Sequence, residues 1–469
     1  MSRKGIVILY LIGDWLAAWL SWLLLYWVRK ELEFESYGME MEFHFERNLL
    51  LGLVLVPLFW IVLYAAWGMY SNVMRRHRLR DVGQVAGTSI IGNLILFFVL
   101  LLDDQLPNFS YYYYTLGTLL VAHFVLTLFF KTCITTRTVH QIQRGKWGFP
   151  TVIVGGNARA LQLVEEIKAL KKSPGFHFVG FLKINGQDDL LQTHMTQLGK
   201  YPELSMILEK HAVEEVIISL ESGDHKELER ILALLGNHNV HVSIIPDTFD
   251  IVSGTVKMTS VFGVPLIRLK TDLMPTWQFS LKRFFDVLLS VMALLVLLPV
   301  FFVLALAVKL SSKGPIFFFQ ERVGKGGRPF QIVKFRSMYV NAEQHGPQLS
   351  SASDNRITPV GKFLRKTRFD EFPQFWNVLR GDMSLVGPRP ERQFYIDQIS
   401  QHNPHYHKLH RIRPGITSWG QVKYGYAENV EQMVQRLKYD LLYLENMSLA
   451  MDIKILFYTI VIVLKGSGK

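Results

Sequence analysis

The chain contains almost no cysteine. Cys133 is the only one in 469 residues, so neither an intrachain disulfide nor a cysteine-based metal cage can form. Zinc-finger and single-strand-binding signatures are also missing, and nucleic acid is therefore not an expected partner. The first apolar run has no small-residue cleavage site, which argues against a cleavable secretory signal.

Hydrophobic residues are abundant and the charge is strongly positive. They make up 49% of the chain, and the formal net charge is +12 at pH 7. This combination favours a chain that inserts into a membrane and is attracted to an anionic lipid surface.

Residues 1–148 contain four apolar runs, each close to the ~20 residues that a membrane-spanning helix needs. Basic residues precede the first run, fill the second loop and follow the fourth run, whereas the first and third loops are acidic. The positive-inside rule then places both ends of this region in the cytoplasm. A soluble helical bundle is the alternative, but it leaves the alternation of charge unexplained. The runs are residues 5–28, 49–70, 84–102 and 111–133.

Residues 149–250 alternate between strand and helix patterns, which predicts a parallel Rossmann-like sheet. The glycine motif is incomplete, because Gly155 and Gly156 are followed by "NARA". The second strand candidate ends in Lys183 rather than in an acid that could hold a ribose. We therefore expect a degenerate nucleotide-binding motif with a structural or regulatory role, whose ligand the sequence does not name.

A linker at 251–279 leads to a fifth apolar run, Phe284–Val308. Positive charge at both ends disfavours a position outside the cytoplasm for either end. Pro299 lies near the middle, where it removes a helical hydrogen bond and clashes with the preceding turn. We therefore predict a re-entrant helix broken at Pro299; a kinked fifth span is the alternative. The apolar tail that follows Ile455 predicts a helix at the membrane interface.

Acids and arginines gather between Phe369 and Glu391. Adjacent acids usually lie on a solvated surface, but aromatic residues surround this pair. Carboxylates bind Mg²⁺ together with substrate phosphates, and arginines clamp phosphate oxygens. An upstream hairpin, Gln320–Met338, would bring two more cations to one face. The residues expected at a phosphate site are Lys334, Arg336, Arg365, Asp370, Glu371, Asp382, Pro388 and Arg389.

Four segments of the sequence resemble those of a known protein family. "KRFFDVLLS", "SKGPIFFFQERVGKGGRPFQIVKFRSM", "GKFLRKTRFDEFPQFWNVLRGDMSLVGPRPE" and "RPGITSWGQV" resemble the catalytic domain of the monotopic phosphoglycosyl transferases, the bacterial polyprenyl-phosphate sugar-1-phosphate transferases. The whole layout is similar to long-form members of the undecaprenyl-phosphate glucose or galactose phosphotransferase type. The implied fold is a membrane α-helical bundle, an α/β Rossmann-like domain, and an α/β membrane-associated catalytic domain at 280–469 with a re-entrant helix at 284–308.

The resemblance implies a reaction and a location. A sugar-1-phosphate would pass from a UDP-sugar to undecaprenyl phosphate at the cytoplasmic face of the bacterial inner membrane, with release of UMP. Asp370 would be the nucleophile that forms a covalent phospho-sugar intermediate, and Glu371 would help to hold Mg²⁺. Arg365 and Arg389 match family positions near the phosphates. The product would initiate O-antigen, capsule or exopolysaccharide synthesis, and a homodimer is expected.

Two departures from the family pattern limit what can be carried over. Leu298 replaces the serine that often precedes the helix-breaking proline. No Gly-Arg-Asn follows Gln421 and Val422, so nucleotide contacts near Lys423–Tyr426 stay open, with Lys423 as a weak substitute. An inactive membrane sensor or scaffold is the alternative function. A nucleotide-sugar dehydratase or epimerase is excluded, since its Tyr-x-x-x-Lys pair is missing from 150–250. The sequence does not name the sugar.

Overall fold

The computed structural model describes residues 3–37, 47–101, 110–184, 190–220, 225–235, 238, 240–246, 266–269, 273–340, 342, 346, 354–425 and 427–464. Two compact units are distinguished. One comprises Met1–Phe149 with Glu165–His177, and the other comprises Pro150–Val164 with Phe178–Lys469. The two acidic loops predicted in the first region lie mostly outside the described residues, as does most of the predicted linker.

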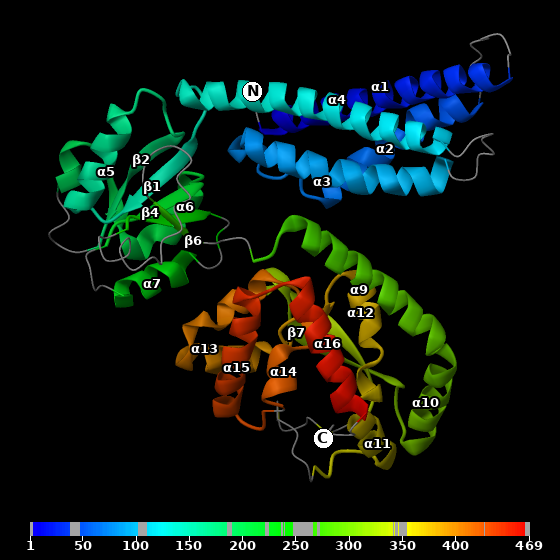
Figure 1. The fold of residues 1–469 in the computed structure, drawn as a ribbon. Coiled ribbons are helices and arrows are strands. Elements are labelled where there is room, and N and C mark those ends of the chain that lie inside the picture. Colours follow the sequence, from blue (N-terminus) through cyan, green and yellow to red (C-terminus); the bar gives the residue numbers. More distant parts are fainter. Residues whose placement is uncertain are drawn as a thin grey trace. The chain divides into compact units, whose positions relative to one another are not determined.

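The four apolar runs predicted near the N-terminus all form long helices. Their surfaces stay apolar on the outside, where Val62 and Phe129 are each 60% exposed. All four are long and apolar enough to cross a membrane. α1 packs along α4 and α2, and α3 packs on α4 (Figure 1). The helices are α1 (Arg3–Tyr37), α2 (Arg47–Ala66), α3 (Arg78–Leu96) with a following π-helical turn (Phe97–Leu101), and α4 (Ser110–Gln143).

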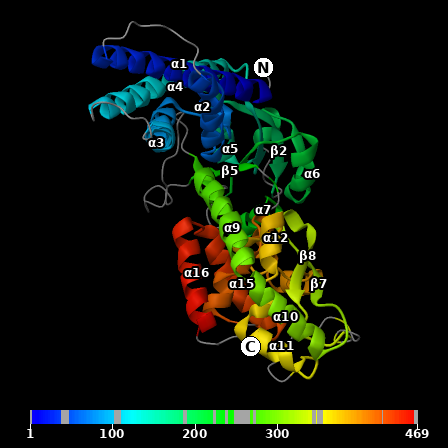
Figure 2. The ribbon, with the colours of Figure 1, turned by 90° about the vertical axis from the view of Figure 1, so that its right-hand side faces the viewer.

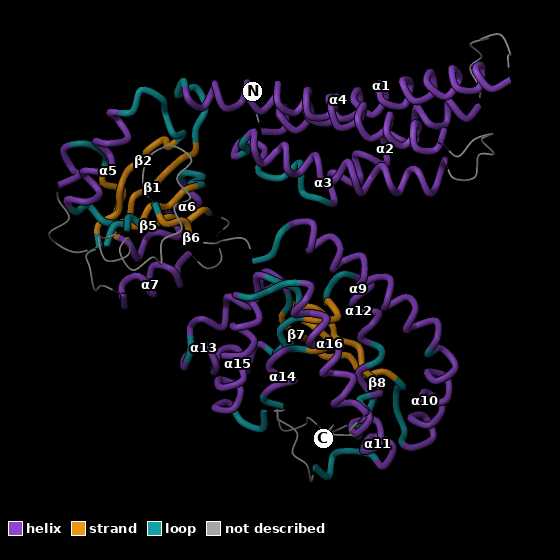
Figure 3. Tube along the Cα trace, in the orientation of Figure 1, coloured by secondary structure: helices purple, strands orange, loops and turns teal. Residues whose placement is uncertain are grey.

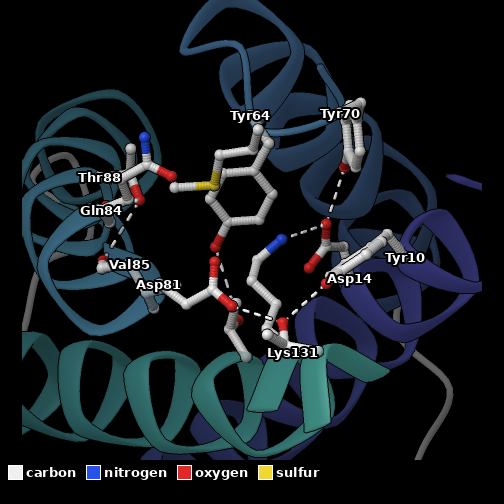
Figure 4. Close-up of polar contacts among 12 residues, drawn as sticks. Tyr10, Asp14, Tyr64, Tyr70, Asp81, Gln84, Val85, Thr88 and Lys131 are labelled. Carbon is white, nitrogen blue, oxygen red and sulfur yellow. Dashed lines mark hydrogen bonds and ion pairs between the residues drawn. The ribbon is translucent and has the colours of Figure 1, made fainter. Parts of the chain in front are cut away.

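The helical bundle contains buried charged side chains that the hydropathy pattern does not reveal. The Lys131 ammonium on α4 lies 2.7 Å from the Asp14 carboxylate on α1, and the Tyr70 hydroxyl donates to the same carboxylate at 2.8 Å (Figure 4). Arg76 pairs with Asp81 at 3.0 Å. All four charged side chains are at most 4% exposed. Charges in an apolar bundle are stable only when they are paired, so these contacts fix how the helices meet.

The middle of the chain forms one six-stranded sheet in the order β3-β2-β1-β4-β5-β6. β1 is parallel to β4, β4 to β5 and β2 to β3, as predicted, whereas the edge strand β6 is antiparallel. Figure 3 shows the strands at the centre of this region with helices around them. The elements are β1 (Phe149–Val154), α5 (Ala158–Ala169), β2 (Phe176–Lys183), β3 (Gln197–Lys200), α6 (Leu204–Lys210), β4 (Glu215–Ile218), α7 (His225–Leu235), β5 (His241–Ile244) and β6 (Ile267–Leu269).

The turn after β1 is closed by its own side chains. Gly155 has φ +103°, and a methyl group there would overlap the Ser219 carbonyl oxygen at the end of β4. The side-chain Oδ1 atom of Asn157 accepts hydrogen bonds from the Ala160 amide at 3.1 Å and from the Ser219 hydroxyl at 2.6 Å. These contacts hold the helix start against the neighbouring strand, in the crevice where dinucleotides bind to complete motifs.

The two described parts of the predicted linker form regular secondary structure. Ile267–Leu269 forms β6 and extends the sheet past residue 250, and α9 (Thr276–Val296) begins before residue 280. α9 is separated from α10 (Leu298–Ser311) by Leu297, with a 63° bend between the two helices (Figure 1). The break lies two residues before Pro299 rather than at it, because a proline fits the first turn of a helix but not its interior.

In the C-terminal part, helices and short strands pack around a core beside α9 and α10. The predicted hairpin is present as β7 (Phe317–Val323) and β8 (Pro329–Phe335). α12 lies beside α9 (Figures 1 and 2). The other elements are α11 (Pro359–Thr367), a 3₁₀ turn (Phe369–Glu371), α12 (Gln374–Arg380), β9 (Ser384–Val386), α13 (Gln393–His402), a 3₁₀ segment (Pro404–Arg411), β10 (Gly415–Thr417), α14 (Trp419–Lys423), α15 (Val430–Glu445) and α16 (Leu449–Leu464).

Candidate active site

The adjacent acids lie in a short turn between two helices. α11 ends at Thr367, the next residue Arg368 has a left-handed backbone with φ +61°, and Asp370 and Glu371 follow in the 3₁₀ turn. Phenylalanine rings flank this turn, with Phe369 and Phe372 4.8 Å apart. The aromatic packing leaves Asp370 8% and Glu371 7% exposed. This pair is therefore not part of a solvated surface.

Glu371 is held by two cations from separate parts of the chain. Lys334 on β8 contacts Oε1 at 2.7 Å, and Arg389 in the loop after β9 lies 3.7 Å from the same oxygen. Burial by itself raises the pKa of this carboxyl, but Lys334 and Arg389 outweigh it and lower the pKa to about 2. Glu371 is therefore ionised at every physiological pH.

Asp370 is in the opposite electrostatic situation. Burial raises the pKa of its carboxyl to about 6, the neighbouring Glu371 charge adds to this effect, and Lys334 opposes it. No hydrogen bond to this carboxylate is present in the described part of the chain. The turn thus presents one carboxylate tied to cations beside one that makes no hydrogen bond among the described residues.

The Arg389 loop is held by contacts at several points. The Gly415 amide donates to the Pro388 carbonyl at 2.9 Å, and Pro390 follows on the other side of the arginine. Beyond it, the buried Glu391 carboxylate accepts from Arg436 at 2.6 Å and from Arg322 at 3.2 Å, and lies 3.8 Å from the Arg389 Nε atom. One carboxylate therefore orients three guanidinium groups.

A pocket opens between these elements. It is lined by Arg322, Lys334, Glu371, Gln374, Arg389 and Gly415 among others. Three of these side chains are cationic and one is anionic, so the pocket favours an anionic ligand with oxygen acceptors.

Comparisons with known proteins agree with this chemistry. A family model described as bacterial sugar transferase matches residues 277–466, and a model described as a CoA-binding domain matches residues 65–246. A UDP-glucose:undecaprenyl-phosphate glucose-1-phosphate transferase from Caulobacter vibrioides is 41% identical over 45% of this chain and 77% of its own length. The chain belongs to the bacterial sugar transferase family. The resemblance predicted from the sequence motifs is thereby confirmed.

Other relatives of the family extend the match toward the N-terminus. A UDP-galactose-lipid carrier transferase from Erwinia amylovora is 30% identical over 69% of each chain. A UDP-N-acetylgalactosamine-undecaprenyl-phosphate N-acetylgalactosaminephosphotransferase from Aeromonas hydrophila is 43% identical over 54% of this chain. The present chain spans 60% of the length of the Aeromonas protein, and these names differ in the sugar.

Two predicted site residues lie elsewhere in this member of the family. Arg336 follows β8 and donates to the Ser312 carbonyl at 2.7 Å and to its hydroxyl at 2.9 Å, so it caps the C-terminal end of α10. Asp382 lies two residues after the end of α12, 3.6 Å from Arg380, and does not line the pocket. Lys334 lines the pocket whereas Arg336 contacts the end of α10, because the regular strand ends at Phe335.

Arg365 lies close enough to Asp370 to influence its carboxyl, whereas Lys423 contacts aromatic rings instead. The Arg365 Nε atom donates to the Ser337 hydroxyl at 3.0 Å, and its charge lowers the pKa of Asp370, although burial still dominates. Lys423 lies over the rings of Trp419 and Tyr458, 5.0 Å from each centroid, and does not line the pocket. Tyr426 lies outside the described residues.

Sequence reasoning missed four residues of the site: Arg322, Gln374, Glu391 and Arg436. Glu391 ends the motif "VGPRPE", so the motif marks it as a candidate. Its partner Arg436 lies 45 residues away on α15, and no local pattern connects the two.

The acids suit Mg²⁺ by donor type. Magnesium prefers one or two carboxylates together with substrate phosphates. Asp370 has no hydrogen-bond partner in the described part of the chain, and the ion pairs of Glu371 use Oε1. No cluster of three or more acid, histidine or cysteine ligands exists among the described residues, so the remaining ligands would come from substrate and water.

Proposed function

We propose that this protein transfers a sugar-1-phosphate from a UDP-sugar to undecaprenyl phosphate. The observation that carries the proposal is the buried Asp370 carboxylate, which has no hydrogen bond within the described residues and lies beside the cationic pocket of Lys334 and Arg389. Such a carboxylate is a nucleophile suited to phosphoryl transfer, and the relatives' names describe this reaction for them.

The proposed reaction proceeds in two displacements. A carboxylate oxygen of Asp370 attacks the sugar-bearing phosphorus, the bond from that phosphorus to the bridging oxygen breaks, and UMP leaves with the electron pair. A phosphate oxygen of the lipid then attacks the same phosphorus. The bond to Asp370 breaks, which restores the carboxylate and yields a lipid diphosphate sugar. Lys334, Arg365 and Arg389 would stabilise phosphoryl charge, and Mg²⁺ held by Asp370 and Glu371 would neutralise part of it.

The membrane arrangement follows from the lipid substrate. Four spanning helices would anchor the chain in the bacterial inner membrane, and α9 with α10 would enter and leave on the cytoplasmic side. Positive charge at both ends of this pair and the 63° bend support a re-entrant path. We also propose a homodimer, and a product that initiates O-antigen, capsule or exopolysaccharide synthesis.

Labelling of single cysteines tests the re-entrant path. In a Cys133→Ser background, Thr276→Cys and Lys313→Cys mark the two ends of the helix pair, both at exposed positions. Both should react with an impermeant thiol reagent only after the inner membrane is opened. Reaction of the second position from the periplasm in intact spheroplasts would instead establish a fifth span.

UMP release from protein in nanodiscs tests the reaction. Undecaprenyl phosphate, Mg²⁺ and a panel of UDP-glucose, UDP-galactose and UDP-N-acetylgalactosamine would be supplied to the wild type and to Asp370→Asn. Asp397→Asn, an exposed aspartate on α13, is the matched control. UMP released with one sugar, lost in the first variant and kept in the second, supports the proposal. Folded protein that releases no UMP with any donor would favour the sensor or scaffold alternative.

A further inference from the structure

Gln374 is buried at the pocket wall without a complete set of hydrogen bonds. It begins α12, three residues after Glu371, and is 2% exposed. Its Nε2 atom has no hydrogen-bond partner among the residues that the structure describes. The side chain lines the pocket together with Lys334, Glu371 and Arg389. A buried donor without an acceptor is unfavourable, so its presence in this position calls for a ligand that supplies one.

The same helix contains a second side-chain amide, that of Asn377, whose function is structural. Asn377, one turn further along α12, accepts the Val333 amide at 3.0 Å and donates to the Gln331 carbonyl at 2.7 Å. Both ends of its amide are therefore used to dock α12 on β8. Because Asn377 makes this contact, the docking does not require the Gln374 amide.

The charge of the pocket identifies the chemistry of the missing acceptor. Arg322, Lys334 and Arg389 favour an anion, and the Gln374 side chain lines the same pocket, so an anionic oxygen is the acceptor that fits its free amide N–H. Gln374 lies three residues after Glu371 and lines the same pocket, so an acceptor that satisfies it would belong to a group bound beside that turn.

We propose that Gln374 donates a hydrogen bond to a non-bridging oxygen of the sugar-bearing phosphoryl group of the donor. This inference rests on the proposed function and assigns a further substrate-binding residue to the same pocket. The hydrogen bond would hold that phosphoryl group in reach of Asp370 while the sugar remains free to vary.

Comparing the binding of UDP with that of UMP tests this role of Gln374. Only UDP has a second phosphate in the position of the sugar-bearing phosphoryl group. The full-length protein in nanodiscs with Mg²⁺ would be titrated with each nucleotide for wild type and Gln374→Met, which keeps the shape of the side chain. We expect UDP to bind the variant about tenfold more weakly or worse, and UMP to bind equally well. Tenfold corresponds to about 1.4 kcal/mol.

Thermal unfolding without nucleotide provides the folding control. Gln374→Met should match or exceed the wild type, since it removes an unsatisfied buried group, whereas Asn377→Leu should unfold at a lower temperature with its UDP-to-UMP affinity ratio unchanged. Equal loss of UDP and UMP binding by Gln374→Met, or loss of neither, overturns the role of Gln374. Wild-type protein that binds neither nucleotide overturns the proposed function itself.

Discussion

Removing the charge of Glu391 should affect both stability and rate. The carboxylate is 4% exposed and makes ion pairs with Arg436 at 2.6 Å and Arg322 at 3.2 Å. Glu391→Gln keeps its size but leaves these buried guanidinium groups without their shared counterion. Breaking a buried ion pair in this way destabilises a protein by about 3–5 kcal/mol. For a domain of this size that corresponds to a fall in Tm of roughly 6–20 °C.

The rate should fall for a separate reason. The Arg389 Nε atom lies 3.8 Å from Glu391, and its guanidinium group reaches Glu371 at 3.7 Å on the other side. Without Glu391 the arginine loses one of the two carboxylates that orient it, so we expect kcat to drop about tenfold or more below the unfolding temperature. Glu391→Asp keeps the charge and should recover part of the rate.

Thermal unfolding and UMP release in nanodiscs measure the two effects. Glu431→Gln, on the exposed side of α15, serves as the control and should behave like the wild type. A Glu391→Gln variant with the Tm and the rate of the wild type would refute the positioning role.

Three further predictions follow from features away from this loop. Because the pKa of Asp370 is raised to about 6, kcat/KM should rise with pH through about 6 and level off above it; a flat profile between pH 5 and 8 would contradict a buried nucleophile. Asp14→Leu or Lys131→Met alone should lower the Tm, because each leaves one buried charge unpaired and so destabilises the fold by about 3–5 kcal/mol. The double variant should recover most of this loss of stability. Gly155→Ala should destabilise the sheet region by about 1–3 kcal/mol, measured as faster amide exchange in β1 and β4.

Local patterns were sufficient to predict much of the fold. Four runs of about twenty apolar residues became four helices, and the alternation of strands and helices became a mainly parallel sheet. The hairpin formed where glycines interrupt two strand patterns. In each case the signal lies within one segment, and the period of the side chains decides the structure.

Features that depend on distant partners could not be predicted in the same way. Arg336 belongs to the same strand pattern as Lys334, yet its side chain donates a hydrogen bond to a carbonyl at the end of α10. The three residues Ile267–Leu269 are too short to form a recognisable pattern and become a strand only because β5 offers them an edge. The Glu391–Arg436 pair joins residues far apart in sequence, and Gln374 is conspicuous only once its burial is known.

The Asp14–Lys131 pair also constrains how the protein is made. The two residues are 117 positions apart, so α1 leaves the ribosome long before α4 is synthesised. Until then the Asp14 carboxylate would lack its counterion in lipid, with the Tyr70 hydroxyl as its earlier partner, and an unpaired aspartate there costs about 2.5–3.5 kcal/mol. The first helix therefore gains its full stability in the bilayer only after the fourth is inserted. A nascent chain that stops after α3 should be a target for membrane quality control, whereas one that reaches α4 should be released as a finished bundle.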